Sequence, residues 1–446
     1  MKKHGFTLIE LMVAMVVGLT AITSVYSLGA AMSKQFYEEQ RIATTQGTTR
    51  VAIMQLRRDI SRAGLFGSPN GTLEPTCDTT PPALPLLGGG SGPMGAFQYY
   101  ADEDLGVLDP DGDNPSVHAD RLRVLTSLYL TDELQVHSAS SDGTVIVLEN
   151  GNQAYRRTFA WGQTAGPFTS GVAPEYLTGD LLDWDNAWST ETASWKGIAQ
   201  KGARAFQTGS VLHIETPEGR HFFRSVFGKA ANAENEVRIQ VTPALPMGTA
   251  CLPGAAEASV VAPLQWVEYA VVDPLDTSEV GADFMDFDGI FYIDLSDTSS
   301  PSYQLQGADA GAGSLREAPN RVLVRRVIDS QTGNVRPSST QVIAEFVSNF
   351  SVSFLVDNNS GTATAPSLAV EDRTTGAEAD INANPERVRT VMIELGIRNP
   401  LEDPDIPFMA DDAGTRFEVN AAQAGSARVR NMRIEIPVMD VARRNL

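Results

Sequence analysis

The sequence predicts an α+β protein: one long N-terminal helix followed by a β-rich, mainly antiparallel globular head. Residues 6–63 contain no proline and carry a helix-type pattern, whereas strand-type runs recur between turn signals along the remaining chain. Alternation of apolar and other residues is clearest at 391–397 and 434–438, which predicts antiparallel strands with one buried face.

The first half of the predicted helix, residues 6–32, is apolar on all sides apart from Glu10. About 20 apolar residues cross a bilayer, so this segment is long enough to span one. Lys2 and Lys3 precede it, and positively charged flanks stay in the cytoplasm. We therefore expect a single-pass inner-membrane protein whose chain beyond Met32 is periplasmic.

The second half of the helix, residues 33–64, turns polar and then amphipathic. Its apolar side chains fall at helical spacing, which predicts a stripe that docks on the head; they are Ala52, Ile53, Leu56, Ile60 and Ala63. Thr44–Thr49, with Gly47 at its centre, is a weak helix former. Gly64 suits the position just after the helix.

Glu10 is the most informative residue of the apolar segment. A charged side chain at the centre of a membrane helix costs roughly 2.5–3.5 kcal/mol on insertion scales, so a carboxylate kept there indicates function and needs a partner. It stands in the string His4-Gly5-Phe6-Thr7-Leu8-Ile9-Glu10, directly after a basic stub.

This string resembles the class III leader of type IV pilins and of the pseudopilins of type II secretion. The resemblance implies that residues 1–5 are a leader, that a prepilin peptidase cuts between Gly5 and Phe6, and that the new Phe6 amine is methylated. It also implies that Glu10 is an assembly residue, which neutralises a Phe6 amine. Positions four apart share a helix face, so the same helix can supply that amine, although the resemblance favours a neighbouring subunit.

Two simpler interpretations of the segment remain open. A Sec signal peptide would be cut near Ser27–Gly29, but its apolar core would measure about 7–15 residues, and this segment is about twice as long. A plain membrane anchor fits the length but explains neither Glu10 nor the string before it.

The segment Leu56–Gly67 resembles the end of the long helix in PilW-type minor pilins of the type IV pilus. That resemblance implies a protein at or near the pilus tip, which primes assembly with other minor pilins and the major pilin and supports a large tip adhesin. Alternatives are a J-type minor pseudopilin of type II secretion, or a pilus-borne adhesin that acts through residues 150–320.

The head is predicted to begin after a Pro/Gly-rich loop at 65–119 and to occupy 120–446, with an insertion at about 150–320 that matches no pattern we can place. The candidate strands are 121–130, 143–149, 210–215, 221–227, 236–242, 265–272, 290–295, 321–328, 340–347, 350–356, 388–397 and 429–438.

The charge and cysteine content restrict the function. Against 34 basic residues stand 55 acidic ones, a net charge of −21, which argues against nucleic acid as a partner because phosphate binding needs Lys/Arg patches. In an oxidising periplasm Cys77 and Cys251 can form a disulfide or remain buried thiols, and the sequence leaves both open. The scattered histidines make a zinc site unexpected.

One acidic loop is a candidate calcium site. Asp109, Asp111, Asp113 and Asp120 occupy positions 1, 3, 5 and 12 of an EF-type loop, where calcium takes oxygen ligands. Asn114 replaces the turn glycine and Pro115 stands at position 7, so a solvated acidic turn is the alternative. The sequence contains no nucleophile elbow, P-loop or metalloprotease motif, and we expect no enzymatic activity.

Overall fold

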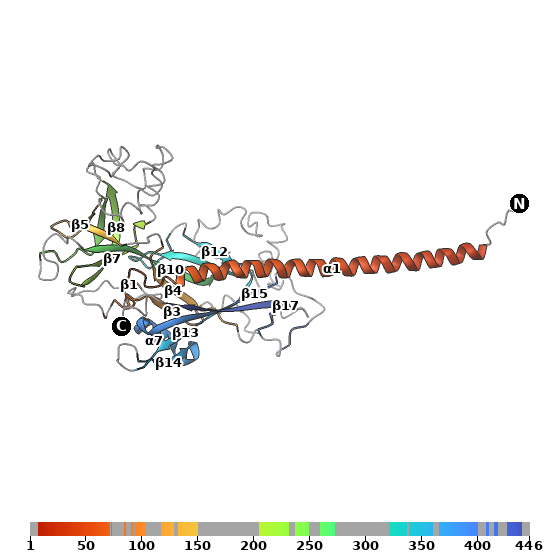
Figure 1. The fold of residues 1–446 in the computed structure, drawn as a ribbon. Helices are drawn as coiled ribbons and strands as arrows, with labels where there is room; N and C mark the ends of the chain where they lie inside the picture. Colours follow the sequence, from red (N-terminus) through yellow and green to blue (C-terminus); the bar gives the residue numbers. More distant parts are fainter. Residues whose placement is uncertain are drawn as a thin grey trace, which may run out of the picture.

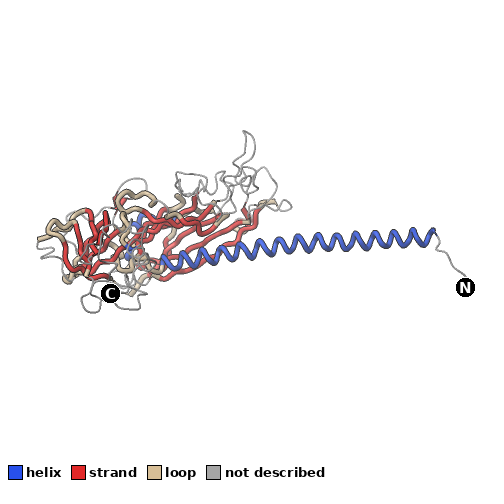
Figure 2. Tube along the Cα trace, turned by 90° about the horizontal axis from the view of Figure 1, so that it is seen from above, coloured by secondary structure: helices blue, strands red, loops and turns tan. Residues whose placement is uncertain are grey.

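The computed structural model describes residues 8–71, 73, 84–85, 91–92, 94–103, 117–128, 133–149, 205–231, 237–248, 259–272, 321–336, 339–359, 365–399, 407–409, 414–417 and 426–438. The predicted α+β architecture is confirmed: a helix projects far beyond a head built mainly of antiparallel strands (Figure 1). Figure 2 shows the same arrangement from above.

Helix α1 runs without a break from Leu8 to Ile60. Its 53 residues correspond to a rod of about 80 Å. The weak helix formers around Gly47 do not interrupt it. The helix closes with a tighter turn, in which the Ala63 amide donates to the Ile60 carbonyl at 3.0 Å, and Gly64 takes a left-handed φ of 73°. The α-helix therefore ends at Ile60, three residues before the predicted end at 63, and Gly64 follows the tighter turn rather than the helix itself.

Two sheets form the part of the head nearest the helix. In the first, the neighbours in order are β3 (Phe97–Tyr100), β4 (Arg121–Thr126), β10 (Val260–Val272), β11 (Val322–Ile328) and β12 (Gln341–Ala344). The second is five-stranded, in the order β14 (Leu368–Glu371), β13 (Val347–Asp357), β15 (Val388–Arg398), β17 (Ala427–Pro437) and β16 (Arg416–Phe417).

The main core lies where these two sheets and the end of α1 meet. Phe350 and Phe354 of β13 and Ile393 and Leu395 of β15 are fully buried there. The predicted docking stripe of the helix is confirmed, because its side chains belong to this buried surface; they are Ala52, Ile53, Leu56, Ile60 and Ala63.

A second core fills a small barrel at the end of the head farthest from the helix N-terminus (Figure 1). Its strands pair antiparallel in a closed ring, in the order β10, β5 (Leu134–Ala139), β6 (Val145–Leu148), β9 (Val237–Thr242), β8 (His221–Ala231), β7 (Val211–Glu215) and back to β10. Closure leaves no open edge in this ring, and apolar side chains fill the interior.

Strand β10 belongs to both parts of the head. Val260–Leu264 pair with β7, and Trp266–Val272 pair with β11. Pro263 lacks an amide hydrogen and lies between the residues that pair with β5 and those that pair with β4. A proline is tolerated where one edge of a strand changes partner, because no ladder hydrogen bond is required of it there.

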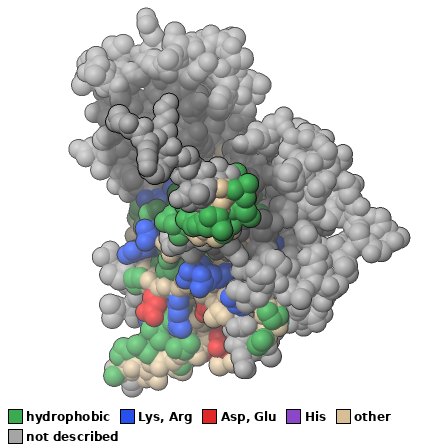
Figure 3. Space-filling model, turned by 90° about the vertical axis from the view of Figure 1, so that its right-hand side faces the viewer, with side chains coloured by type: hydrophobic (Ala, Val, Ile, Leu, Met, Phe, Trp, Pro, Cys, Tyr) green, Lys and Arg blue, Asp and Glu red, His purple; other side chains and the backbone are tan. Residues whose placement is uncertain are grey.

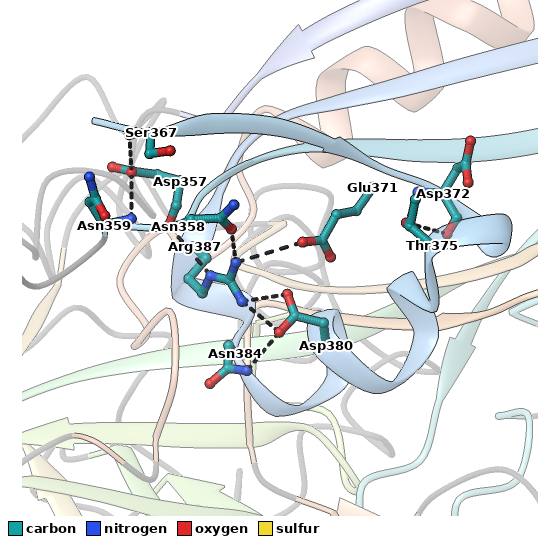
Figure 4. A network of polar contacts seen from close by, with 10 residues as sticks. All are labelled: Asp357, Asn358, Asn359, Ser367, Glu371, Asp372, Thr375, Asp380, Asn384 and Arg387. Atoms are coloured by element: carbon teal, nitrogen blue, oxygen red, sulfur yellow. Dashed lines mark hydrogen bonds and ion pairs between the residues drawn. The ribbon is translucent and has the colours of Figure 1, made fainter. Parts of the chain in front are cut away.

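The short helix α7 (Ala377–Ala383) is fastened to the second sheet by Arg387 (Figure 4). The Arg387 guanidinium binds both Asp380 oxygens, at 2.5 and 2.7 Å, and donates to Asn358. Glu371 of β14 lies 3.6 Å away on the other side of the guanidinium. One arginine thereby holds a helix, a strand and a hairpin loop together.

The strand predictions at 121–130, 143–149, 210–215, 221–227, 236–242, 265–272, 321–328, 340–347, 350–356, 388–397 and 429–438 each fall on an observed strand. The candidate at 290–295 lies outside the described residues. Strands β3, β5, β14 and β16 and helix α7 were not predicted. The loop prediction at 65–119 overlaps β3 and the short pair β1 (Leu84–Pro85) and β2 (Ser91–Gly92).

Candidate functional site: the N-terminal helix and its seat on the head

The N-terminal half of α1 presents apolar side chains with nothing from the head to cover them. From Leu8 to Met32 the large apolar side chains that the structure describes are between 57% and 79% exposed. Among the described residues, one helix is long and apolar enough to cross a membrane, and its span is Met12–Gly29. Figure 3 shows these side chains end-on, in green.

The threonine and serine hydroxyl groups between Thr20 and Ser27 are satisfied within the helix itself. Thr20 donates to the Val17 carbonyl at 2.9 Å, and Thr23 donates to the Leu19 carbonyl at 2.8 Å. Ser24 donates to the Thr20 carbonyl at 2.8 Å. Internal hydrogen bonds remove the need for water, so these residues are compatible with a hydrocarbon environment.

The processing residues lie at the very start of the chain. Gly5 and Phe6 fall outside the described residues, and Glu10 lies in the first turn of α1. Their assigned roles therefore stay predictions.

The other end of α1 is held by a buried polar contact. The Asp59 carboxylate is fully buried, and its Oδ2 accepts from the Tyr269 hydroxyl at 2.8 Å and from Arg325 Nε at 2.5 Å. Arg58 approaches the other oxygen at 3.2 Å from the solvent side. Asp59 thus ties the last turn of the helix to β10 and β11.

Burial and charge act together on the partners of Asp59. Desolvation raises the pKa of Tyr269 well above its usual value, and the negative Asp59 adds to this. Burial works against the charged form of Arg325, but the Asp59 carboxylate more than offsets it and raises the pKa of the guanidinium. The tyrosine therefore stays a neutral donor and the arginine stays a cation.

A second buried charge cluster is centred on Glu268, the residue before Tyr269 in β10, and it lies on the opposite face of the sheet. Glu268 of β10 is completely buried and accepts from Arg123 of β4 and Arg326 of β11, both at 2.6 Å. Burial works to raise the pKa of Glu268, but the two guanidiniums overcome it and hold this pKa at about 2. Glu268 is therefore ionised at neutral pH, and it pairs with one arginine on each of the two strands that flank β10.

Hydrogen bonds to the backbone of residues 62–66 also hold the chain against the head beyond the end of the helix. The Gly64 amide donates to the Leu125 carbonyl at 3.0 Å, and the Thr126 hydroxyl donates to the Arg62 carbonyl at 3.1 Å. Further along, Phe66 offers its carbonyl to the His213 ring at 2.7 Å. The segment Leu56–Gly67 is thus the part of the chain that joins α1 to both the sheet and the barrel.

The residues that hold Asp59 and Glu268 were missed at the sequence level, although a signal existed. Glu268 stands inside the apolar run Val260–Val272, and Arg325 and Arg326 stand inside Val322–Ile328. Charges within runs that are otherwise apolar predict paired buried groups. Their partners cannot be identified from the run alone.

The calcium and disulfide predictions fall largely outside the described residues. Asp109, Asp111, Asp113, Cys77 and Cys251 all lie there, so both stay predictions.

Asp120 is described, and its two oxygens accept from the Asp102 amide at 3.0 Å and the Val352 amide at 2.6 Å. Burial raises its pKa to about 6, against the opposing effect of these two amides. Asp120 thus joins the start of β4 to β13.

Comparison with known proteins bears on the first residues of the chain. The family model of the prokaryotic N-terminal methylation motif matches residues 1–26. No curated protein matches the chain, and no solved structure matches it. The motif and the exposed apolar helix that contains part of it are the features of a membrane-anchored single-pass protein. The chain therefore carries the class III leader of type IV pilin-like proteins.

Proposed function

We propose that this protein is a PilW-like minor pilin of a type IV pilus, which enters the filament at or near its tip. The observation that carries the proposal is continuity: a methylation motif opens a helix whose first half is bare and apolar and whose second half is seated on a β-rich head. A bare apolar half-helix of this kind is stable in a membrane or in a bundle of like helices.

The role is structural rather than catalytic. Prepilin peptidase cuts between Gly5 and Phe6 at the cytoplasmic face, and the mature Phe6 amine is balanced by Glu10. Apolar helices then bundle with those of other minor pilins and the major pilin, while the head supports a large tip adhesin. The resemblance of Leu56–Gly67 to PilW-type proteins supports the pilus, and its contacts fix the head to the helix.

The first test is the N-terminus and intact mass of the full-length protein from cells with and without prepilin peptidase. We expect a chain that starts at methylated Phe6 only when the peptidase is present. An uncut chain starting at Met1 in both strains contradicts the proposal in favour of a plain anchor, and a start near Ala30 contradicts it in favour of a Sec signal peptide.

A second test addresses assembly. Glu10→Gln should be processed normally but be lost from sheared filaments, because the Phe6 amine loses its counter-charge. Glu10→Asp keeps the charge and serves as the matched control. A deletion strain that loses secretion but keeps twitching would assign the chain to the J-type pseudopilins instead.

The adhesin alternative requires a narrower deletion than 150–320. That segment contributes β7, β8, β9 and β10, and β10 also pairs with β4 and β11 of the main head. Removing residues 151–200 leaves every described strand in place. Loss of surface binding with normal piliation in that deletion would favour an adhesin.

A further inference from the structure

Two histidines and a glutamate gather on the outer face of the barrel. His213 and Glu215 are two residues apart on β7 and share a face, and His221 of β8 is the cross-strand partner of Glu215. Their neighbours Leu212, Ile214 and Phe222 belong to the barrel core, so the three polar side chains point away from it.

The His213 ring is oriented by the segment that follows the helix. Its Nδ1 lies 2.7 Å from the Phe66 carbonyl, so this nitrogen carries the proton and donates it. The lone pair of His213 is therefore on Nε2, which lies 2.9 Å from Nδ1 of His221. A histidine whose second nitrogen donates to a backbone carbonyl is held in the tautomer and orientation that metal ligation requires.

The three side chains together make a ligand set. One ligand atom from each of His213, Glu215 and His221 lies within 4.8 Å of the other two. Both histidines are buried, and Glu215 is half-buried at the open side. Two imidazoles and a carboxylate suit zinc rather than calcium, which takes oxygen ligands.

We propose that His213, Glu215 and His221 bind a zinc ion, with water as the fourth ligand. Zinc–ligand bonds of about 2.0–2.1 Å place tetrahedral ligand atoms roughly 3.3 Å apart. The 2.9 Å between the two ring nitrogens therefore opens by about 0.4 Å on binding. Without metal, Nδ1 of His221 donates to Nε2 of His213 across the same gap, and the two ring planes are nearly parallel, 7° apart.

A metal here would strengthen the joint between the barrel and the helix. His213 contacts both the zinc and the Phe66 carbonyl, two residues after Gly64. Binding would fix the β7–β8 hairpin against this segment. A zinc site was unexpected from the sequence because the histidines are scattered along it. The sequence does not show the β7–β8 register, which brings His213 and His221 together.

The test uses the full-length protein in detergent, stripped with a chelator and dialysed against zinc, with bound metal measured by mass spectrometry. We expect one zinc per chain that resists a weak competing chelator, and a melting temperature that rises with zinc concentration. Co²⁺ substitution should give the visible spectrum of a tetrahedral nitrogen–oxygen site.

Variants separate this site from others on the chain. His221→Gln and Glu215→Gln should each weaken zinc affinity by about 100-fold or more, whereas His137→Gln, on an exposed position of β5 in the same barrel, should leave it unchanged. Asp111→Asn tests whether zinc binds the acidic loop instead. Circular dichroism in excess chelator confirms that each variant folds.

Two outcomes overturn the proposal. One is a wild-type protein that binds no zinc, which would leave the two histidines as a hydrogen-bonded pair. The other is equal zinc affinity in wild type and in both folded ligand variants.

Discussion

Asp59 and Arg325 form a buried ion pair, 2.5 Å from Oδ2 to Nε, between the last turn of α1 and the middle of β11. The carboxylate has no exposed surface, and the arginine side chain is 10% exposed. Asp59 also meets an exposed cation, Arg58, whose side chain is 56% exposed. The same carboxylate therefore has one buried and one solvated partner, which allows a direct comparison.

Asp59→Ala should destabilise the head strongly, because it leaves Arg325 buried without its counter-charge. Losing one partner of a buried pair costs about 3–5 kcal/mol, whereas a surface pair contributes up to about 1 kcal/mol. Arg58→Ala is therefore the matched control and should change little. Urea unfolding followed by the fluorescence of the buried Trp266 measures both. Equal losses in the two variants would contradict the assignment of Arg325 as the main partner.

Glu268 should make the head sensitive to acid. Its pKa of about 2 in the folded protein is below the ordinary value of 4.5, so its stabilising effect is complete above about pH 4.5 and fades as the pH falls towards 2. Glu268→Gln should cost about 3–5 kcal/mol at pH 7, because Arg123 and Arg326 stay buried. The gap between wild type and variant in unfolding free energy should narrow between pH 4.5 and 2. A gap that is independent of pH would show that the charge of Glu268 is not what stabilises the strands.

Glu345 should make the folded protein less stable as the pH rises, which is the opposite of the effect of Glu268. It lies between β12 and β13, its Oε1 is buried without a hydrogen-bond partner, and burial raises its pKa from 4.5 to about 7. A raised pKa stabilises the folded state below about pH 4.5, and this stabilisation is lost as the pH rises through 7. Relative to wild type, Glu345→Gln should gain on the order of 1 kcal/mol between pH 4.5 and 8, after allowance for solvent screening of this half-buried group. Denaturation at the two pH values checks the sign, and a gain at pH 4.5 alone would refute it.

Arg387 should stabilise the position of α7 on the second sheet. Arg387→Gln removes the two-pronged contact with Asp380 and leaves Asp380 and Glu371 facing each other, at a cost of about 1.5–3 kcal/mol. Arg387→Lys should lose part of this stabilisation, because a single ammonium cannot replace both Nη1, which binds Asp380, and Nη2, which binds Asn358. Arg428→Gln, at an exposed position of β17, is the control. Protease cleavage near α7 should become faster, and the melting temperature lower, from Arg428→Gln through Arg387→Lys to Arg387→Gln. If Arg428→Gln is as unstable as Arg387→Gln, the contacts of Arg387 are not what holds α7 in place.

The sequence predicted those features that depend on local patterns. The apolar run and the stripe from Ala52 to Ala63 are each recognised from a few neighbouring residues, and helix α1 agrees with them. Most strands were found for the same reason. Strand β5, with the letters LQVHSA, carries only weak alternation and was missed.

Features that depend on distant partners were not predictable. Asp59 is separated from Tyr269 by 210 positions and from Arg325 by 266, so no spacing rule connects them. Barrel closure depends on β10 pairing with both β5 and β7, and alternation within a strand specifies a face but not a partner. The His213–His221 contact likewise appears only once the β7–β8 register is known.

Strand β10 also restricts how this protein can vary. Val261 of this strand belongs to the barrel core, whereas Val267, Tyr269 and Val271 belong to the main core. A substitution that suits the barrel must therefore suit the main sheet as well, because any change in the twist or offset of the strand passes directly from one to the other. Because the barrel and the main sheet share β10, we expect them to diverge together in evolution rather than to be exchanged separately between proteins.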